Sequence, residues 1–158
     1  MEQKKKEKQV KSNVLNKTRV KKQVTSKPIN WYLVNAQGSI LGKVAAKVAS
    51  ILLDKNDPKR KSYEIPQSRV VIINAGKVEV SGRKEENKKY YRYSGYPSGL
   101  RERTLAQLRS QKPEEIINHA VFGMLPKNRM GKSLRRHLFI YSGSSHPHEA
   151  QKFETLEV

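Results

Sequence analysis

The apolar stretch Val70-Val71-Ile72-Ile73 decides the fold of this chain, because four consecutive β-branched residues are typical of a strand buried on both faces. An earlier run, Trp31-Tyr32-Leu33-Val34, predicts another strand that ends at Asn35-Ala36, before a turn at Gln37-Gly38. Between the two strands, apolar residues recur with helical spacing at positions 41, 44, 45, 48 and 52. This order of strand, helix and doubly buried strand predicts a parallel βαβ unit, and hence an α/β fold with helices on both sides of the sheet.

Weaker signals continue this pattern toward the middle of the chain. A charged segment from Lys55 to Arg69, with Pro58 and Pro66, predicts a loop before the buried strand. A brief strand is predicted from Lys77 to Val80. Residues 83–103 combine basic residues, Gly, Pro and Tyr without a buried period, so we expect an ordered loop there.

Helices are predicted near Thr104 to Arg109, after Pro113 and after Asn128. The helix after Pro113 has two glutamates in its first turn, which favour the positive end of the helix dipole. The last strand is predicted at Phe139-Ile140-Tyr141, with a Gly-, Ser- and His-containing tail on the surface after it. The predicted apolar face of the helix after Pro113 consists of Ile116, Ile117, Ala120, Val121 and Met124.

The charge of the chain limits its function more than its length does. Among 158 residues, 33 Lys or Arg stand against 14 Asp or Glu, a formal net charge of +19. A protein this basic is expected to bind a polyanion, and nucleic acid is the commonest such partner. The absence of Cys excludes a disulfide framework, a thiolate metal site and a cysteine nucleophile. No apolar run approaches the roughly 20 residues of a membrane span, and the amino terminus lacks the apolar centre of a secretory signal, so we expect a soluble protein.

Residues 1–30 differ in composition from the rest of the chain. They hold ten Lys or Arg and two Glu, a net charge of +8, and contain neither Gly nor an aromatic residue. Such a segment buries too little apolar surface to offset its ordering entropy, so we predict a disordered basic extension that an anionic partner can order. A solvated tail without a target and an organellar transit peptide are the alternatives, although transit peptides are Arg-rich and acid-poor. Residues 31–158 are predicted to form a single α/β domain.

The segment from Lys88 to Arg101 is the strongest local signal for nucleic-acid binding. Cations can meet phosphates, tyrosine rings can stack on unpaired bases, and glycine lets the backbone approach a ligand closely. The alternative is a β-hairpin or loop whose tyrosines pack on the body, and we expect Tyr90 or Tyr91 to belong partly to the core. The predicted RNA contacts in this segment are Lys88, Lys89, Arg92, Tyr93, Ser94, Gly95, Tyr96 and Arg101.

A second basic group surrounds the predicted helix after Asn128. Its cations lie at the helix start and along the outer face, and backbone N–H groups at a helix start can also hold a phosphate. A solvated helix face is the alternative. The predicted RNA contacts here are Lys127, Asn128, Arg129, Lys132, Arg135 and Arg136. Lys43 and Lys47, four residues apart on the polar face of the first helix, are further predicted contacts.

No catalytic or metal site is predicted. Gly131-Lys132-Ser133 resembles the end of a phosphate-binding loop, but that pattern requires Gly at position 126, which is Pro. His146, His148 and Glu149 lack the Cys or third His that a metal site needs, so a polar surface turn is favoured. The few carboxylates are scattered among cations, where they screen charge rather than perform acid–base chemistry. We therefore expect no enzymatic activity, no cofactor and no small-molecule substrate.

Six ordered motifs between Trp31 and Glu157 resemble one known family. They are Trp31-Tyr32, Leu41-Gly42-Lys43, Val71 to Ala75, Tyr93 to Pro97, Ala120 to Asn128 and His146 to Gln151. The order and spacing of these motifs resemble those of the universal large-subunit ribosomal protein thirteen family in its bacterial and organellar form. The resemblance implies a three-layer α/β/α fold around a four-stranded, mainly parallel sheet, and early binding to large-subunit ribosomal RNA during assembly.

The resemblance also implies which residues face RNA and which partners lie nearby. Neighbouring large-subunit ribosomal proteins are the implied protein partners. The implied RNA-facing positions are Lys43, the Tyr93 to Gly99 loop, the Lys127 to Arg136 stretch, His146 and His148. The chain departs from the family's usual residues at four places, having Asn35 for Asp, Ser68-Arg69 for Gly-Asp, Tyr93 for His and Ser98 for Gly.

The predicted function is therefore that of a structural constituent of the large ribosomal subunit that binds ribosomal RNA and supports early assembly. The alternative is an RNA-binding translational regulator that acts off the ribosome through the same surface. A peripheral membrane protein is less favoured, because residues 1–30 offer neither an amphipathic nor a lipidated anchor. The composition of the extension favours a cytoplasmic bacterial ribosome over an organellar one.

Overall fold

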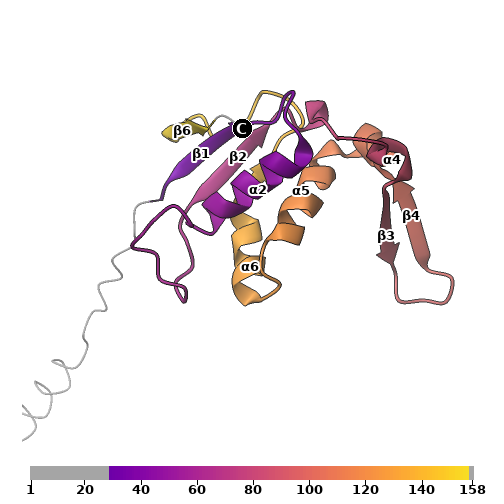
Figure 1. Cartoon of the computed structure of the whole chain (residues 1–158), viewed down its shortest axis with the longest axis horizontal. Coiled ribbons are helices and arrows are strands. Elements are labelled where there is room, and N and C mark those ends of the chain that lie inside the picture. The colour runs from indigo at the N-terminus through magenta and orange to yellow at the C-terminus, as the bar shows by residue number, and fades with distance from the viewer. Residues whose placement is uncertain (1–28, 157–158) are drawn as a thin grey trace, which may run out of the picture.

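Four parallel strands form the centre of the structure (Figure 1). The structure is a computed structural model, and it describes residues 29–156. The strands are β1 (Trp31–Asn35), β2 (Arg69–Ile73), β5 (Leu138–Ile140) and β6 (Phe153–Leu156), arranged in the order β5-β2-β1-β6. All three neighbouring pairs are parallel, and Ile72 lies between Val34 and Ile140 in the register. The predicted α/β fold with a four-stranded parallel sheet and flanking helices is confirmed.

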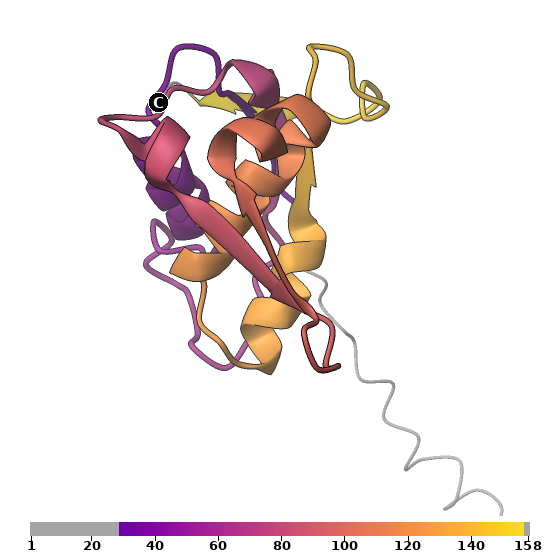
Figure 2. The same ribbon diagram turned by 90° about the vertical axis from the view of Figure 1, so that its right-hand side faces the viewer.

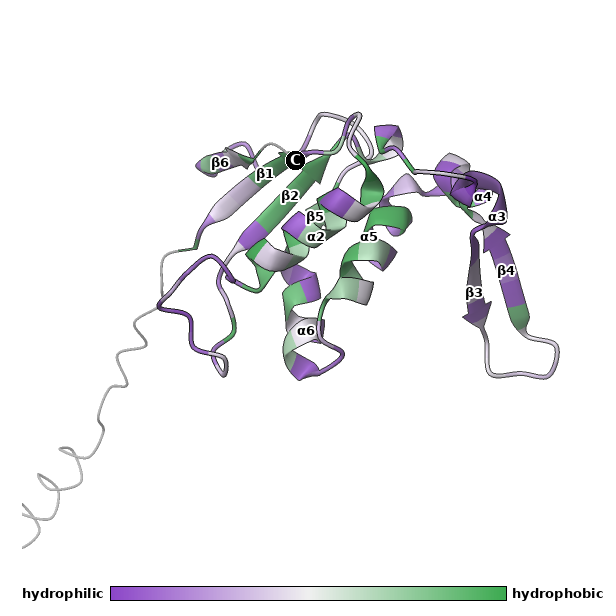
Figure 3. Cartoon of the chain, in the orientation of Figure 1, coloured by the Kyte–Doolittle hydropathy of each residue, from purple (hydrophilic) through white to green (hydrophobic). Residues whose placement is uncertain are grey.

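Strand β2 is buried on both faces, as its apolar run predicts. Val70, Val71 and Ile72 are each fully buried. Val70 and Ile72 belong to the main hydrophobic core beneath the helices, and Val71, between them in the strand, points to the opposite face. Figure 3 shows β2 in the middle of the sheet as an apolar ribbon after its hydrophilic first residue. This central position explains why a parallel strand carries no alternation of polar residues.

Two helices, α2 (Leu41–Leu52) and α5 (Pro113–Met124), pack against one another and cover one face of the sheet (Figure 1). The apolar positions predicted in α2 are all buried. In α5, Ile116, Ile117 and Val121 are buried, but Met124 is 46% exposed. The prediction of a core position was therefore wrong for Met124, because this residue lines an open cavity beside the start of α2 instead of packing on the sheet.

The other face of the sheet is covered by the segment 141–152, which crosses from β5 to β6 and supplies the third layer in place of a helix. Its His148 ring lies 4.7 Å from the Phe139 ring and 5.3 Å from the Trp31 ring, centroid to centroid. Phe153 packs edge-on against Trp31 at 6.0 Å. This face therefore adds a group of aromatic rings to the aliphatic Val71, and the rings make stacked and edge-to-face contacts.

Three sequence predictions about strands were wrong. The surface tail contains the true last strand, β6, which pairs with β1, more than a hundred residues earlier in the chain. Residues 77–80 form no strand; a 3-10 helix, η1 (Ala75–Lys77), is followed by one isolated bridge between Ile40 and Glu79. The segment expected to be an ordered loop contains a short helix, α3 (Lys84–Asn87), and a β-hairpin of β3 (Lys89–Tyr93) and β4 (Leu100–Thr104).

Helix α4 (Leu105–Gln111) joins this hairpin to the body. It begins with a capping box, in which Thr104 and Gln107 each accept a hydrogen bond from the other's backbone N–H. Arg109 then donates to the carbonyl oxygens of Gly76 and Val78, at 3.2 and 2.8 Å, and pairs with Glu85 of α3 at 2.7 Å. One half-buried guanidinium therefore fixes α3 and α4 to the loop that follows β2.

The chain after α5 forms α6 (Arg129–Leu134) and the 3-10 helix η2 (Arg135–His137), which lead directly into β5. Among residues 29–156, no helix is long and apolar enough to cross a membrane. The predicted basic extension lies outside the described residues except for Ile29 and Asn30, so its disorder stays a prediction.

Candidate nucleic-acid interface

The hairpin of β3 and β4 projects from the body and lies on its outer side (Figures 1 and 2). Its antiparallel register places Tyr91 opposite Glu102, Arg92 opposite Arg101 and Tyr93 opposite Leu100. Figure 3 shows both strands as mainly hydrophilic ribbons, in contrast to the central sheet. The hairpin contacts α3 and α4 at its base and is held together by its own ladder of hydrogen bonds, and most residues of both strands are exposed.

The two faces of the hairpin differ in chemistry. Directly paired residues of an antiparallel ladder point to the same face, and successive residues alternate between faces. One face therefore carries Tyr91, Tyr93 and Leu100, which are 64, 64 and 61% exposed. The other face carries the arginines at positions 92, 101 and 103. The sequence predicted neither this separation nor a contact at Arg103, because the ordered loop expected for residues 83–103 has no cross-strand register.

The arginine face holds concentrated positive charge. Arg92 and Arg101 lie directly opposite each other, an arrangement that costs stability unless an anion compensates it. Neither forms an ion pair with a carboxylate of the described residues, whereas Lys89 on the tyrosine face pairs with Glu102 at 3.2 Å. A groove of about 640 Å³ runs between this face and helices α4 and α5. Lys112, Glu115 and His119 line its far side, where Glu115 pairs with Lys112 at 3.9 Å.

Tyr90 connects the hairpin to the body. Its ring lies 5.3 Å from the His119 ring and packs against the hydrophobic core, which confirms that a tyrosine of this segment belongs partly to the core. The Lys88 ammonium sits 5.3 Å from the same ring. Burial raises the pKa of the Tyr90 phenol above its ordinary value. Tyr90 thus has a structural role. The tyrosines that are exposed enough to contact a partner are Tyr91, Tyr93 and Tyr96, the last of which is 75% exposed.

The turn between the strands presents Tyr96 to solvent. Ser94 and Gly99 close the turn through a backbone hydrogen bond of 3.2 Å, and Gly99 N–H donates to the Tyr96 carbonyl oxygen at 2.9 Å. A Cβ on Gly99 would lie 2.8 Å from that oxygen, so this position requires glycine. The predicted contacts Ser94 and Gly95 lie in this turn and are exposed.

Helix α6 forms the second basic surface and is built on a close backbone contact. The Asn128 side chain accepts a hydrogen bond from Gly131 N–H at 2.9 Å and so caps the helix. Gly131 itself lies against the Pro126 carbonyl, and a Cβ at this position would overlap that oxygen. The close contact with Pro126 therefore explains the glycine at position 131 without a phosphate-binding loop.

The cations of this surface are exposed. Residues 127–136 contain five Lys or Arg and no Asp or Glu, and all five cations are exposed: Lys127, Arg129, Lys132, Arg135 and Arg136. The Arg135 guanidinium lies 5.0 Å from the Phe122 ring, so packing fixes its side chain as well. Helix α6 and the tip of the hairpin extend toward the same end of the molecule, the lower end in Figures 1 and 2.

The remaining predicted contacts lie elsewhere. Lys43 and Lys47 are exposed on the outer face of α2. His146 and His148 are half-buried in the aromatic layer, where His148 Nε2 lies 2.9 Å from the Tyr141 hydroxyl and Nδ1 of His146 accepts from His148 N–H at 3.3 Å. The two histidines therefore have packing partners within the fold. The described residues contain no group of three or more His, Cys, Asp or Glu that could hold a metal ion.

Comparison with known proteins assigns the chain to a family. A family model described as ribosomal protein L13 matches residues 29–147. The chain belongs to the ribosomal protein L13 family. The large ribosomal subunit protein uL13 of Synechocystis sp. is 48% identical over 128 residues, which cover 81% of this chain and 85% of that protein. The protein of the same name from Spiroplasma citri is 42% identical over 147 residues, covering 93% of this chain and 96% of its own length. A third such protein, from Solibacter usitatus, is 45% identical over 128 residues, 81% of this chain and 90% of its own length.

Membership of the ribosomal protein L13 family confirms the resemblance that the six motifs indicated. Members of this family are structural constituents of the large ribosomal subunit and not enzymes, which also confirms the prediction of a non-catalytic protein. The family match begins at residue 29, where the described structure also begins, so residues 1–28 lie outside both.

Proposed function

We propose that this protein is a structural constituent of the large ribosomal subunit that binds large-subunit ribosomal RNA and supports early subunit assembly. One observation carries the proposal. The arginine face of the hairpin and the outer side of α6 expose cations, and Arg92, Arg101, Arg129 and Arg136 have no ion pair with a carboxylate of residues 29–156. Such cations are stabilised when a polyanion binds, because neutralised phosphates release their condensed counterions.

The hairpin is proposed to lie between two elements of RNA. Its arginine face and the groove behind it suit the phosphate backbone, since Arg binds phosphate oxygens in a bidentate manner. Its tyrosine face suits unpaired bases, which stack on exposed aromatic rings. The basic face would thus supply affinity, and the tyrosine face would supply shape and position along the RNA.

The other predicted contacts are proposed with narrower roles. Lys127, Arg129, Lys132 and Arg136 contact phosphates from α6 and its approach, and Lys43 and Lys47 do so from α2. His146 and His148 would reach RNA only at their exposed edges, because they pack within the aromatic layer. The basic extension is proposed as a separate RNA contact, neighbouring large-subunit proteins as further partners, and the cytoplasmic ribosome as the location.

Charge reversal on α6 tests the RNA contact. We expect Arg129→Glu with Arg136→Glu to weaken binding to a large-subunit RNA fragment by tenfold or more, while the thermal transition of the protein stays nearly unchanged. The matched control is Lys55→Glu with Lys59→Glu, two exposed lysines of the 53–68 loop outside the proposed surfaces. If both double variants bind equally well, α6 is not part of the interface.

Sucrose-gradient fractionation tests the ribosomal role. A structural constituent sediments with the large subunit at low and at high salt, because many contacts hold it within the particle. A translational regulator that acts off the ribosome uses the same basic surface but leaves the particle at high salt. Recovery of the protein only at the top of the high-salt gradient would favour the regulator.

A further inference from the structure

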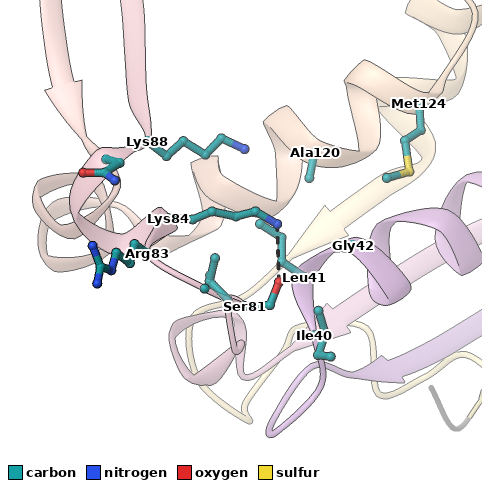
Figure 4. Close-up of a pocket in the computed structure, with 12 residues that line it drawn as sticks. Ile40, Leu41, Gly42, Ser81, Arg83, Lys84, Lys88, Ala120 and Met124 are labelled. Carbon is teal, nitrogen blue, oxygen red and sulfur yellow. Dashed lines mark hydrogen bonds between the residues drawn. The ribbon is translucent and has the colours of Figure 1, made fainter.

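A cavity of about 670 Å³ lies between the start of α2, the end of α5 and the segment 80–88 (Figure 4). It is separate from the groove behind the arginine face, with which it shares no lining residue. Its volume falls within the range of pockets that bind small ligands or single recognition groups.

The floor of this cavity is apolar. Met124 and Ile40, 46 and 38% exposed, line it together with Val80 and Ala120. Figure 4 shows the Met124 and Ala120 side chains pointing from α5 toward the start of α2. Two large apolar side chains are thus left open beside one cavity, where they can contact an apolar or aromatic group of a partner.

One rim of the cavity is cationic. Lys84 and Lys88 extend along it from α3 and the start of the hairpin, whereas Arg83 points away (Figure 4). The Lys84 ammonium lies 3.4 Å from the Ser81 hydroxyl. No carboxylate lines the cavity, and the nearby Glu85 is held by Arg109 at 2.7 Å. The rim therefore attracts an anion.

We infer that this cavity binds one unpaired nucleotide of the large-subunit ribosomal RNA. The base lies on the apolar floor of Ile40, Ala120 and Met124, and its phosphate lies against Lys84 and Lys88. Bases that leave a helical stack are held in this way, between apolar or aromatic side chains, with cations on the backbone. The inference rests on the proposed RNA-binding function and assigns that function a site apart from the hairpin's arginine and tyrosine faces.

The position of the cavity favours RNA over a protein segment. Lys88 directly precedes β3, so an RNA strand that follows the hairpin would reach the rim without leaving the basic surface. A protein segment would need acidic residues to match the rim and apolar ones to match the floor. Ribosomal RNA supplies both a phosphate anion and a flat aromatic ring face in every nucleotide.

Cross-linking from position 124 distinguishes these partners. A benzophenone amino acid replaces Met124 in the full chain. The substituted protein is incorporated into large subunits, and the subunits are irradiated. We expect a cross-link to one site in the large-subunit RNA, and none from the same group at Ile65, an apolar residue that is 47% exposed in the 53–68 loop. A cross-link to protein, or no RNA cross-link at position 124, overturns the inference. Failure of the unsubstituted chain to enter large subunits would overturn the proposed function as well.

Binding of the full chain to a large-subunit RNA fragment provides a second measurement. Met124→Glu places a negative charge on the floor, so we expect affinity to fall about tenfold, against less than twofold for Ile65→Glu. Lys84→Ala with Lys88→Ala should lower the slope of log affinity against log salt by roughly one. Met124 is exposed, so its variant is expected to keep the thermal transition of the parent. Equal affinities of Met124→Glu and Ile65→Glu would overturn the nucleotide site while leaving RNA binding intact.

Discussion

Asn74 Nδ2 donates a hydrogen bond to Asn35 Oδ1 across 2.9 Å and thereby joins the ends of β1 and β2. Asn35 Oδ1 also accepts from Gln37 N–H at 3.1 Å. The Asn74 backbone has φ of 58°, in the left-handed region, and its N–H donates to the Gly143 carbonyl oxygen at 2.9 Å. One buried residue therefore connects the two central strands to the segment that covers the second face of the sheet.

Replacement of Asn74 should destabilise the fold. Asn74→Ala loses the side-chain hydrogen bond and places alanine in the left-handed region, so we expect the free energy of unfolding to fall by about 2 kcal/mol. Asn74→Gly keeps the backbone conformation and should lose about half as much. Chemical denaturation measures both. Asn35→Asp, the residue usual in the family, keeps both accepted hydrogen bonds and serves as the control; equal losses in all three variants would contradict this account.

Gly131 should be intolerant of any side chain. Gly131→Ala forces a Cβ against the Pro126 carbonyl, so we expect a loss of about 1–3 kcal/mol in the free energy of unfolding. Gly123 in α5 provides the matched control, since a Cβ there meets no atom within 4 Å. Gly123→Ala should leave stability unchanged or raise it by up to about 1 kcal/mol. Thermal denaturation compares the two variants, and similar melting temperatures would show that the contact with Pro126 is not needed.

His137 should make stability depend on pH. Burial lowers the pKa of its imidazole below the ordinary value, and the neighbouring Arg69 lowers it further. The folded protein thus favours neutral His137, and this contribution is fully present above the unfolded pKa of about 6.5. It is lost as the pH falls from that value toward the folded pKa. We expect the free energy of unfolding to fall more steeply between pH 7.5 and 5.5 in the parent than in His137→Gln, by urea denaturation; parallel curves would contradict the assignment.

The two faces of the hairpin should affect RNA binding in different ways. Arg92→Ala and Arg101→Ala should each lower the slope of log affinity against log salt by roughly 0.7–0.9, because each removes one phosphate contact. Tyr91→Ala and Tyr93→Ala should lower affinity by about 1–3 kcal/mol each without a change of slope, because each removes a stacked base. Salt titrations of an RNA-binding assay separate the two effects. A change of slope in the tyrosine variants would show that the faces do not act separately.

The sequence by itself determined the central βαβ unit, most of the buried faces of α2 and α5, and the family. These features depend on residues close together in the chain. Buried apolar residues recur at the spacing of a helix or form an unbroken run in a buried strand, and both patterns can be read directly from the sequence. The run at 70–73, the stripe in α2 and the motif from Ala120 to Asn128 are of this kind. The positive charge that points to a polyanion is likewise a property of composition alone.

Only the tertiary structure decided how the hairpin is built, where the last strand lies and that Met124 is exposed beside a cavity. The hairpin strands are exposed on both faces, so no alternation of apolar residues marks them, and the separation of arginines from tyrosines follows from a cross-strand register. Strand β6 is four residues long and is defined by pairing with a strand at the other end of the domain. Such features depend on contacts between segments that are distant in the chain. These contacts stabilise the strands without producing a regular spacing of apolar residues in the local sequence.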